Sequence, residues 1–226
     1  RWLTRFIRPC CLTCGTPEVV GLCDVCADRL PAIGKHCPTC ANSVADDHYP
    51  CGACLRRPPA FSRLLVRWQF TTEVRYIILR GKYHADRCAL RVLEDEACRL
   101  LRAQPVAVDA VVAMPVSAQR LRQRGFNQTL YPAHAAAQAL GVPLIAEGVF
   151  AKAGRPPQSR LRTHAARRRN IRGAFAVRGE LPQRLLLVDD VVTSGATLHE
   201  AARILAAAGV QEIIALAVAA AHRPHP

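Results

Sequence analysis

The sequence predicts a parallel α/β domain that follows a small cysteine-rich module. From residue 59 onward, short apolar runs typical of buried strands alternate with amphipathic helical stretches, which indicates a largely parallel sheet flanked by helices. Before residue 59, eight cysteines occur as four Cys-x-x-Cys pairs. We therefore expect two domains, residues 1–58 and residues 59–226.

The cysteine pairs predict a metal-binding module. They are Cys11-Leu-Thr-Cys14, Cys23-Asp-Val-Cys26, Cys37-Pro-Thr-Cys40 and Cys51-Gly-Ala-Cys54. Tetrahedral zinc takes four thiolates, so these residues make two closed structural zinc sites, a double zinc ribbon. Sequential pairing puts the first two pairs on one ion, whereas a crossed pairing fits the spacing equally well. Paired cysteines without a secretion signal indicate a reducing compartment, and hence a cytoplasmic protein.

Apolar periodicity predicts the elements of the second domain in order. Residues 64–70 alternate like a half-buried strand, and Thr72 caps a helix that runs to about Leu79 and ends at Gly81. The remaining elements are helices over 86–102, 127–140 (with Asn127 as its cap) and 196–208, and strands over 109–113, 144–150, 175–177, 185–189 and 213–219. A polar, Arg-rich connection covers residues 152–173.

The charge balance indicates polyanionic partners. A net charge of +14 and a pI near 9.9 suit nucleic acid or phosphorylated small molecules. Only 5% of the residues are aromatic, which argues against an extended platform for stacking bases. The longest apolar run, 213–221, is far shorter than the roughly 20 residues of a membrane helix, so we expect no membrane insertion.

The stretch Leu185-Leu-Leu-Val-Asp-Asp-Val-Val-Thr-Ser-Gly-Ala-Thr-Leu198 predicts the functional site. Charges are costly to bury, so Asp189 and Asp190 belong at the carboxyl end of the strand, where ligands of open α/β sheets bind. Residues 193–197 form a tight loop that leads into a helix, and such a loop offers backbone N–H groups to a phosphate. A phosphate cradle beside acceptors for hydroxyl groups describes a pocket for a ribose 5-phosphate ligand.

The segment Val188–Thr197 resembles the phosphoribosyl pyrophosphate (PRPP) signature of type I phosphoribosyltransferases. The rest of the chain is similar to one branch, the ComF and GntX-like competence proteins. The resemblance rests on the cysteine module, Gly81-Lys-Tyr-His84, Arg120-Leu-Arg-Gln-Arg-Gly-Phe-Asn-Gln128, Pro156-Pro-Gln-Ser159 and Ala166-Arg-Arg-Arg-Asn-Ile-Arg-Gly-Ala-Phe175. It implies a type I phosphoribosyltransferase-like domain behind the double zinc ribbon.

The resemblance also implies roles for individual residues. Asp189 and Asp190 would contact the ribose hydroxyls as catalytic residues, and Mg²⁺ would accompany PRPP. The PRPP-binding residues would be Thr193, Ser194, Gly195, Ala196, Thr197, Met114, Pro115, Val116, Arg120, Arg124 and Lys82. A flexible loop would close over the site with Gln158, Arg160, Arg167, Arg168 and Arg169. Family members usually carry a histidine after the Met114–Val116 position, where this chain has Ser117-Ala118.

Two functions follow from these features. The first is an enzyme that transfers the phosphoribosyl group of Mg–PRPP to a nitrogen acceptor, linked by the resemblance to DNA uptake in transformation. The alternative is a non-catalytic protein whose zinc ribbon and basic loop bind single-stranded DNA or competence proteins, and whose pocket senses PRPP or a nucleotide. In a third interpretation the ribbon is a structural cap. The sequence names neither the acceptor nor a general base.

Overall fold

The computed structural model describes residues 9–152 and 174–221. In this part of the chain, four parallel strands form one sheet in the order β1-β6-β5-β2. Their bounds are Arg63–Gln69 (β1), Glu212–Ala220 (β6), Arg184–Val192 (β5) and Ala110–Ala113 (β2). The strands β3 (Phe150–Lys152) and β4 (Phe175–Val177) form a separate antiparallel pair. The predicted parallel α/β fold is thereby confirmed.

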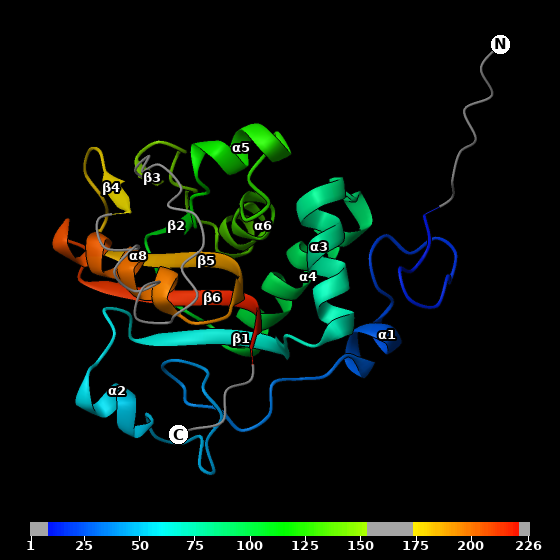
Figure 1. The fold of residues 1–226 in the computed structure, drawn as a ribbon, viewed down its shortest axis with the longest axis horizontal. Coiled ribbons are helices and arrows are strands. Elements are labelled where there is room, and N and C mark those ends of the chain that lie inside the picture. Colours follow the sequence, from blue (N-terminus) through cyan, green and yellow to red (C-terminus); the bar gives the residue numbers. More distant parts are fainter. Residues whose placement is uncertain (1–8, 153–173, 222–226) are drawn as a thin grey trace.

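Helices cover both faces of the sheet (Figure 1). The helices α4 (Arg87–Ala103) and α6 (Leu130–Leu140) lie on one face, and α8 (Ala196–Ala207) lies on the other. Successive side chains of β5 point to opposite faces, so Leu186 and Val188 pack in the first layer and Leu185 and Leu187 in the second. The shorter helices are α1 (Asp24–Arg29), α2 (Gly52–Arg56), α3 (Thr72–His84) and α5 (Ala118–Arg124).

The cysteine-rich segment is joined to the edge of the sheet along β1. Backbone hydrogen bonds connect Ile33 N to Arg67 O and Gln69 N to Pro31 O, both at 2.9 Å. Leu30 and Ala41 belong to the same hydrophobic clusters as residues of the sheet. The domain boundary at residue 58 stays a prediction, but the two parts share apolar cores.

Four predicted elements differ from the structure. The predicted strand over 144–150 is loop and turn with isolated bridges at Leu144 and Glu147, and only Phe150 belongs to a strand, β3. Helix α3 has Thr71 and not Thr72 as its N-cap, and it continues past Gly81 to His84, because Gly81 is buried against Leu90 and serves close helix packing instead of ending the helix. Helix α6 begins at Leu130 with Thr129 as its N-cap, so the prediction that Asn127 caps it was wrong. Strand β5 runs on to Val192, since it pairs with β6 beyond the acidic residues.

None of the helices in the described residues is long and apolar enough to cross a membrane.

Candidate functional site

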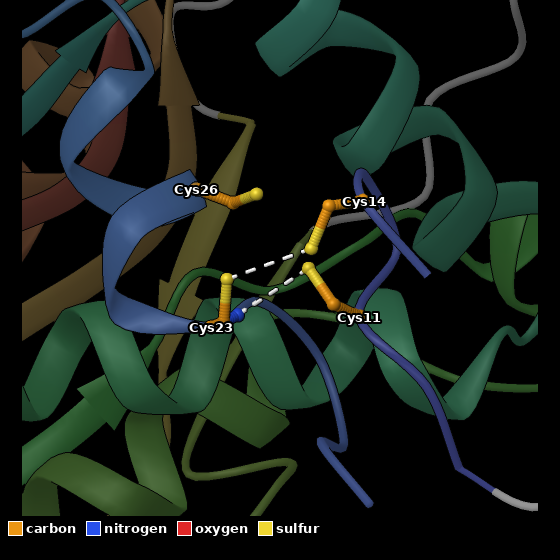
Figure 2. A group of neighbouring side chains, drawn as sticks. All are labelled: Cys11, Cys14, Cys23 and Cys26. Carbon is orange, nitrogen blue, oxygen red and sulfur yellow. Dashed lines mark hydrogen bonds between the residues drawn. The ribbon is translucent and has the colours of Figure 1, made fainter. Parts of the chain in front are cut away.

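Four cysteines near the start of the chain surround one point (Figure 2). The side chains of Cys11, Cys14, Cys23 and Cys26, the first four-cysteine group, point toward one another, and all of their Sγ atoms lie within 4.8 Å of each other. The Sγ atoms of Cys14 and Cys23 are 3.7 Å apart, and tetrahedral zinc with Zn–S bonds of about 2.3 Å requires about 3.8 Å. This group therefore has the size and the donor atoms of a structural zinc site.

The second four-cysteine group has the same construction. The Sγ atoms of Cys37, Cys40, Cys51 and Cys54 lie within 4.8 Å of one another. The Cys40–Cys51 and Cys37–Cys54 sulfur pairs are 3.7 and 4.0 Å apart, and the backbone N–H of Cys51 donates to Cys37 Sγ at 3.2 Å. Such N–H donors stabilise a thiolate. Both groups combine neighbouring pairs in the chain, so the pairing is sequential and the crossed alternative is excluded.

The acidic pair lies where the sheet opens toward solvent. Strand β5 carries Asp189 and Asp190 near its carboxyl end, and residues 193–195 then turn into α8. Gly195 has a φ of +65°, a conformation that glycine adopts without strain. Its backbone forms the N-cap of α8, whose first N–H groups need acceptors. The predicted phosphate loop therefore has the local structure that an anion site requires.

The loop after β2 lies beside the acidic pair. The N–H of Met114 donates to the carbonyl oxygen of Val188 at 2.7 Å, which places residues 114–116 next to the end of β5. The carbonyl oxygen of Met114 accepts from the hydroxyl of Thr129 at 2.7 Å and from Nδ2 of Asn127 at 3.2 Å. Both side chains are buried. Asn127 thus fixes this loop, instead of capping α6.

Asp190 is held by two contacts inside the protein. Its side chain is 3% exposed, and Oδ1 lies 2.9 Å from Lys82 Nζ while Oδ2 accepts from Gln128 Nε2 at 2.9 Å. Arg124 in turn donates to Gln128 Oε1 at 3.0 Å and lies over the Tyr83 ring at 4.7 Å. These contacts join α3, α5 and β5, so the structure brings together the Gly81–His84 and Arg120–Gln128 motifs.

Asp189 has a different environment from its neighbour. Its side chain is partly exposed, and Oδ1 accepts from the backbone N–H of Asp190 at 2.9 Å. Burial and repulsion by the Asp190 carboxylate raise the pKa of Asp189 well above its usual range, although Lys82 opposes this shift. Of the two acids, Asp189 is therefore the one available to a ligand.

Lys152 is a residue of the site that the sequence did not reveal. Burial and the nearby charge of Arg120 lower its pKa, whereas the charge of Asp189 opposes the shift. Its ammonium lies 5.5 Å from the centre of the Phe175 ring. The signal in the sequence was composition: the chain has three lysines, and two of them, Lys82 and Lys152, belong to this site.

The predicted arginines are only partly placed by the structure. Arg120, Arg122 and Arg124 lie on α5, a helix capped by Ser117 that the apolar periodicity had not predicted. Arg120 and Arg122 are exposed. The predicted flexible-loop residues Gln158, Arg160, Arg167, Arg168 and Arg169 lie outside the described residues.

A cavity of about 330 Å³ adjoins the loop after β2. Residues Pro115 and Val116 form part of its wall, together with Asn127, Glu147 and Lys152. Lys152 connects this cavity electrostatically to the acidic pair, because its charge and that of Asp189 act on each other. The candidate site therefore combines the turn into α8, a partly exposed carboxylate and a small cavity.

Comparisons with known proteins agree with this geometry. Residues 129–225 match the phosphoribosyl transferase domain family. The chain is 29% identical over 206 residues to the DNA utilization protein YhgH of Salmonella typhimurium, covering 86% of this chain and 89% of that protein. It is 26% identical over 202 residues to Competence protein F of Haemophilus influenzae, covering 85% and 87%.

Solved structures of transferases are also similar to part of the chain. Orotate phosphoribosyltransferase from Aeropyrum pernix is 20% identical with a TM-score of 0.36, over 59% of this chain and 60% of that one. The allosteric regulatory enzyme of purine biosynthesis is 20% identical with a TM-score of 0.41, over 57% of this chain and 26% of that one.

Proposed function

We propose that the chain binds Mg–PRPP and transfers the phosphoribosyl group to a nitrogen acceptor, because residues 129–225 match the phosphoribosyl transferase domain family, the chain is similar to competence and DNA-utilization proteins, and two four-cysteine groups precede the matched residues. The proposal includes a role in DNA uptake or utilization, as in the names of the relatives, and a cytoplasmic location. One observation carries it. The turn from β5 into α8 combines a phosphate loop with a partly exposed carboxylate at the carboxyl edge of the sheet.

Different residues of the candidate site would contact different parts of PRPP. The N–H groups of residues 193–197 would bind the 5-phosphate, because this turn leads into the first residues of α8, where the positive end of the helix dipole lies. Asp189 would accept hydrogen bonds from the ribose hydroxyls. Lys82 and the arginines of α5 would face the pyrophosphate, which is the most anionic part of PRPP. Residues 114–116 would also lie next to the pyrophosphate.

In the proposed reaction, a nitrogen lone pair of the acceptor forms a bond to C1 of the ribose. The bond from C1 to the pyrophosphate oxygen breaks, pyrophosphate leaves with the electron pair, and the surplus proton of the acceptor passes to water. Mg²⁺ bound with PRPP would neutralise the leaving group as a Lewis acid. The carboxylate of Asp189 would stabilise the positive charge that develops on the ribose.

Calorimetric titration of Mg–PRPP into the zinc-loaded protein tests the proposal. We expect binding to the wild type and a loss of at least tenfold in affinity for Asp189→Asn, because the amide puts an N–H donor where one carboxylate oxygen would accept from a ribose hydroxyl. Asp109→Asn is the matched control, since Asp109 pairs with Arg184 at the opposite end of the sheet. A folded wild type that does not bind Mg–PRPP would refute the proposal.

Zinc occupancy of the two four-cysteine groups is part of the proposal. Sulfur–sulfur distances of 3.7–4.0 Å support it, because they match the edge of a tetrahedral site. All four positions of each ion would be taken by cysteine, so both ions would be structural. Metal analysis of the purified protein should give two zinc ions per chain.

A second candidate function is supported by the exposed arginines of α5 and the names of the relatives. In this alternative the protein binds single-stranded DNA, and the pocket senses PRPP or a nucleotide without turnover. Binding to phosphates releases counterions, so the affinity for DNA would fall steeply with salt. Steeply salt-dependent DNA binding without any release of pyrophosphate would favour this function over the first.

A further inference from the structure

We propose that the first four-cysteine group is an oxidant-sensitive zinc site: hydrogen peroxide oxidises Cys14 and Cys23 to a disulfide and the ion is released, whereas the second group keeps its zinc. The inference rests on the zinc occupancy in the proposed function and is independent of Mg–PRPP binding. It gives the cysteine-rich segment a second role, as a redox-sensitive attachment to the sheet.

The two groups differ in how far solvent reaches their cysteines. In the first group Cys14 is exposed and Cys23 is partly exposed, whereas Cys11 and Cys26 are buried. In the second group three cysteines are buried in one cluster, and only Cys40 is partly exposed. Cysteine oxidation depends on thiolate character and on exposure, and zinc keeps all of its cysteine ligands as thiolates. Exposure therefore separates the two groups, and an oxidant reaches Cys14 first.

The partner of Cys14 in the disulfide follows from the geometry of the group (Figure 2). The Sγ atoms of Cys14 and Cys23 point toward one another and are 3.7 Å apart. A disulfide bond is about 2.05 Å long, so the two sulfur atoms have to approach by less than about 2 Å. Cys10 is also exposed, but it does not belong to the group. Cys23 is therefore the cysteine that reacts with oxidised Cys14.

The oxidation takes place in two balanced steps. The Cys14 thiolate attacks one oxygen of hydrogen peroxide, the O–O bond breaks and hydroxide leaves, so that Cys14 becomes a sulfenic acid. The Cys23 thiolate then attacks the Cys14 sulfur, the S–O bond breaks and a second hydroxide leaves. The two thiolates thereby lose two electrons to the peroxide, and buffer protons neutralise both hydroxide ions. Zinc retains only Cys11 and Cys26 as ligands, and it dissociates.

Loss of this zinc would act on the sheet through α1. Cys23 is the N-cap of α1 and Cys26 lies within it, so a bound ion fixes this helix to the first Cys-x-x-Cys pair. The two aspartates of α1 form ion pairs with Arg67 of β1 and Arg99 of α4. Both arginines also pair with the buried Glu96, at 3.2 and 3.3 Å. Oxidation would therefore loosen α1 and, through these ion pairs, the β1 edge of the sheet.

Zinc release in hydrogen peroxide, followed with a colorimetric zinc indicator, tests the inference. We expect the reduced, zinc-loaded protein to release one ion at least about tenfold faster than the other, because only the first group has an exposed ligand. Mass spectrometry at the end of the fast phase should locate the disulfide between Cys14 and Cys23. Amide hydrogen exchange should then become faster in α1 and change less in α8, which lies on the far face of the sheet from α4.

Histidine variants separate the reactivity of Cys14 from its zinc binding, because imidazole also binds zinc but forms no disulfide. Cys14→His should keep both ions and slow the fast phase at least about tenfold. Cys40→His is the matched control, since Cys40 has the same place in the third Cys-x-x-Cys pair, and the fast phase should persist. Cys10→Ser should also leave the fast phase unchanged.

Results with the wild type alone can overturn the inference. It is wrong if both ions leave at the same rate, if the second group loses its zinc first, or if the disulfide forms between other cysteines. Metal analysis before oxidation distinguishes the two kinds of failure. Protein without zinc would refute the zinc part of the proposed function and this inference with it, whereas two ions released together would refute this inference alone. Titration with Mg–PRPP tests the rest of the proposed function independently.

Discussion

The ion pair between Lys82 and Asp190 should contribute a large coupling energy to folding. Their charged atoms are 2.9 Å apart, and the side chains are 15% and 3% exposed. At that distance an effective dielectric constant near 20 gives an attraction of about 6 kcal/mol, from which the cost of desolvation is subtracted. Removing one partner of a buried pair costs about 3–5 kcal/mol, because the other charge stays buried. We expect Asp190→Asn and Lys82→Met each to lower the free energy of unfolding by about 3 kcal/mol.

The double variant, Lys82→Met with Asp190→Asn, tests whether the two side chains stabilise the fold through their contact with each other. It should lose only about 3–4 kcal/mol, because the second substitution removes a charge that is already unpaired, which gives a coupling energy of about 2–3 kcal/mol. Urea unfolding of the zinc-loaded protein measures all four free energies. The matched control is the exposed pair Arg91–Asp95, for which we expect a coupling energy below about 0.5 kcal/mol. If the effects of Lys82→Met and Asp190→Asn add within about 0.5 kcal/mol, the reasoning is refuted.

Three further predictions concern neighbouring features. The pKa of Asp189 is raised from 3.8 to about 7 in the folded protein; the folded state therefore keeps a proton that the unfolded state releases, and stability falls as the pH rises through this window. Asp189→Asn should flatten that decline in urea midpoints between pH 4 and 7, and an unchanged slope would contradict the shift. Chelation of zinc should lower the thermal midpoint, whereas Cys88→Ser, outside both four-cysteine groups, should not; equal midpoints with and without chelator would rule out structural zinc. Glu96→Gln should cost about 2–4 kcal/mol, because Glu96 is buried between Arg67 and Arg99, and a cost below about 0.5 kcal/mol would show that these pairs are unimportant.

The sequence predicted those parts of the fold that depend on local patterns. The apolar run Leu185–Val188 marked a strand buried on both faces, and the structure places it at the centre of the sheet. The Cys-x-x-Cys spacing marked the two four-cysteine groups, since each pair brings its two sulfurs close within one turn. The amphipathic pattern over 86–102 marked a helix, and the structure has α4 there with Asp86 as its N-cap, accepting from the N–H groups of Cys88 and Ala89.

The features that the sequence did not reveal depend on contacts distant in the chain. The pairing of Asp190 with Lys82 and Gln128 joins three separate elements, and no local pattern encodes it. Helix α5 has no buried residue, so it lacks the apolar stripe by which a helix is recognised. Gly81 is a typical helix terminator, but its packing against Leu90 became visible only with α4 in place. The sequence thus indicated the candidate site, whereas tertiary contacts determine which of its side chains are paired inside the protein and which are exposed.

The attachment of the cysteine-rich segment to β1 determines how bound zinc would affect the candidate ligand site. Residues 31–38 hydrogen-bond along β1, and this segment follows the first four-cysteine group and includes Cys37 of the second. Arg67 of β1 extends the attachment, because it pairs with Asp28 of α1 at 2.8 Å and with the buried Glu96 of α4. The two four-cysteine groups, occupied by zinc in the proposed function, would therefore hold one edge of the sheet whose centre, β5, carries Asp189. Their influence on the ligand would pass through the position of β1 and β6 and not through direct contact, so loss of zinc should weaken Mg–PRPP binding only as far as it destabilises the fold.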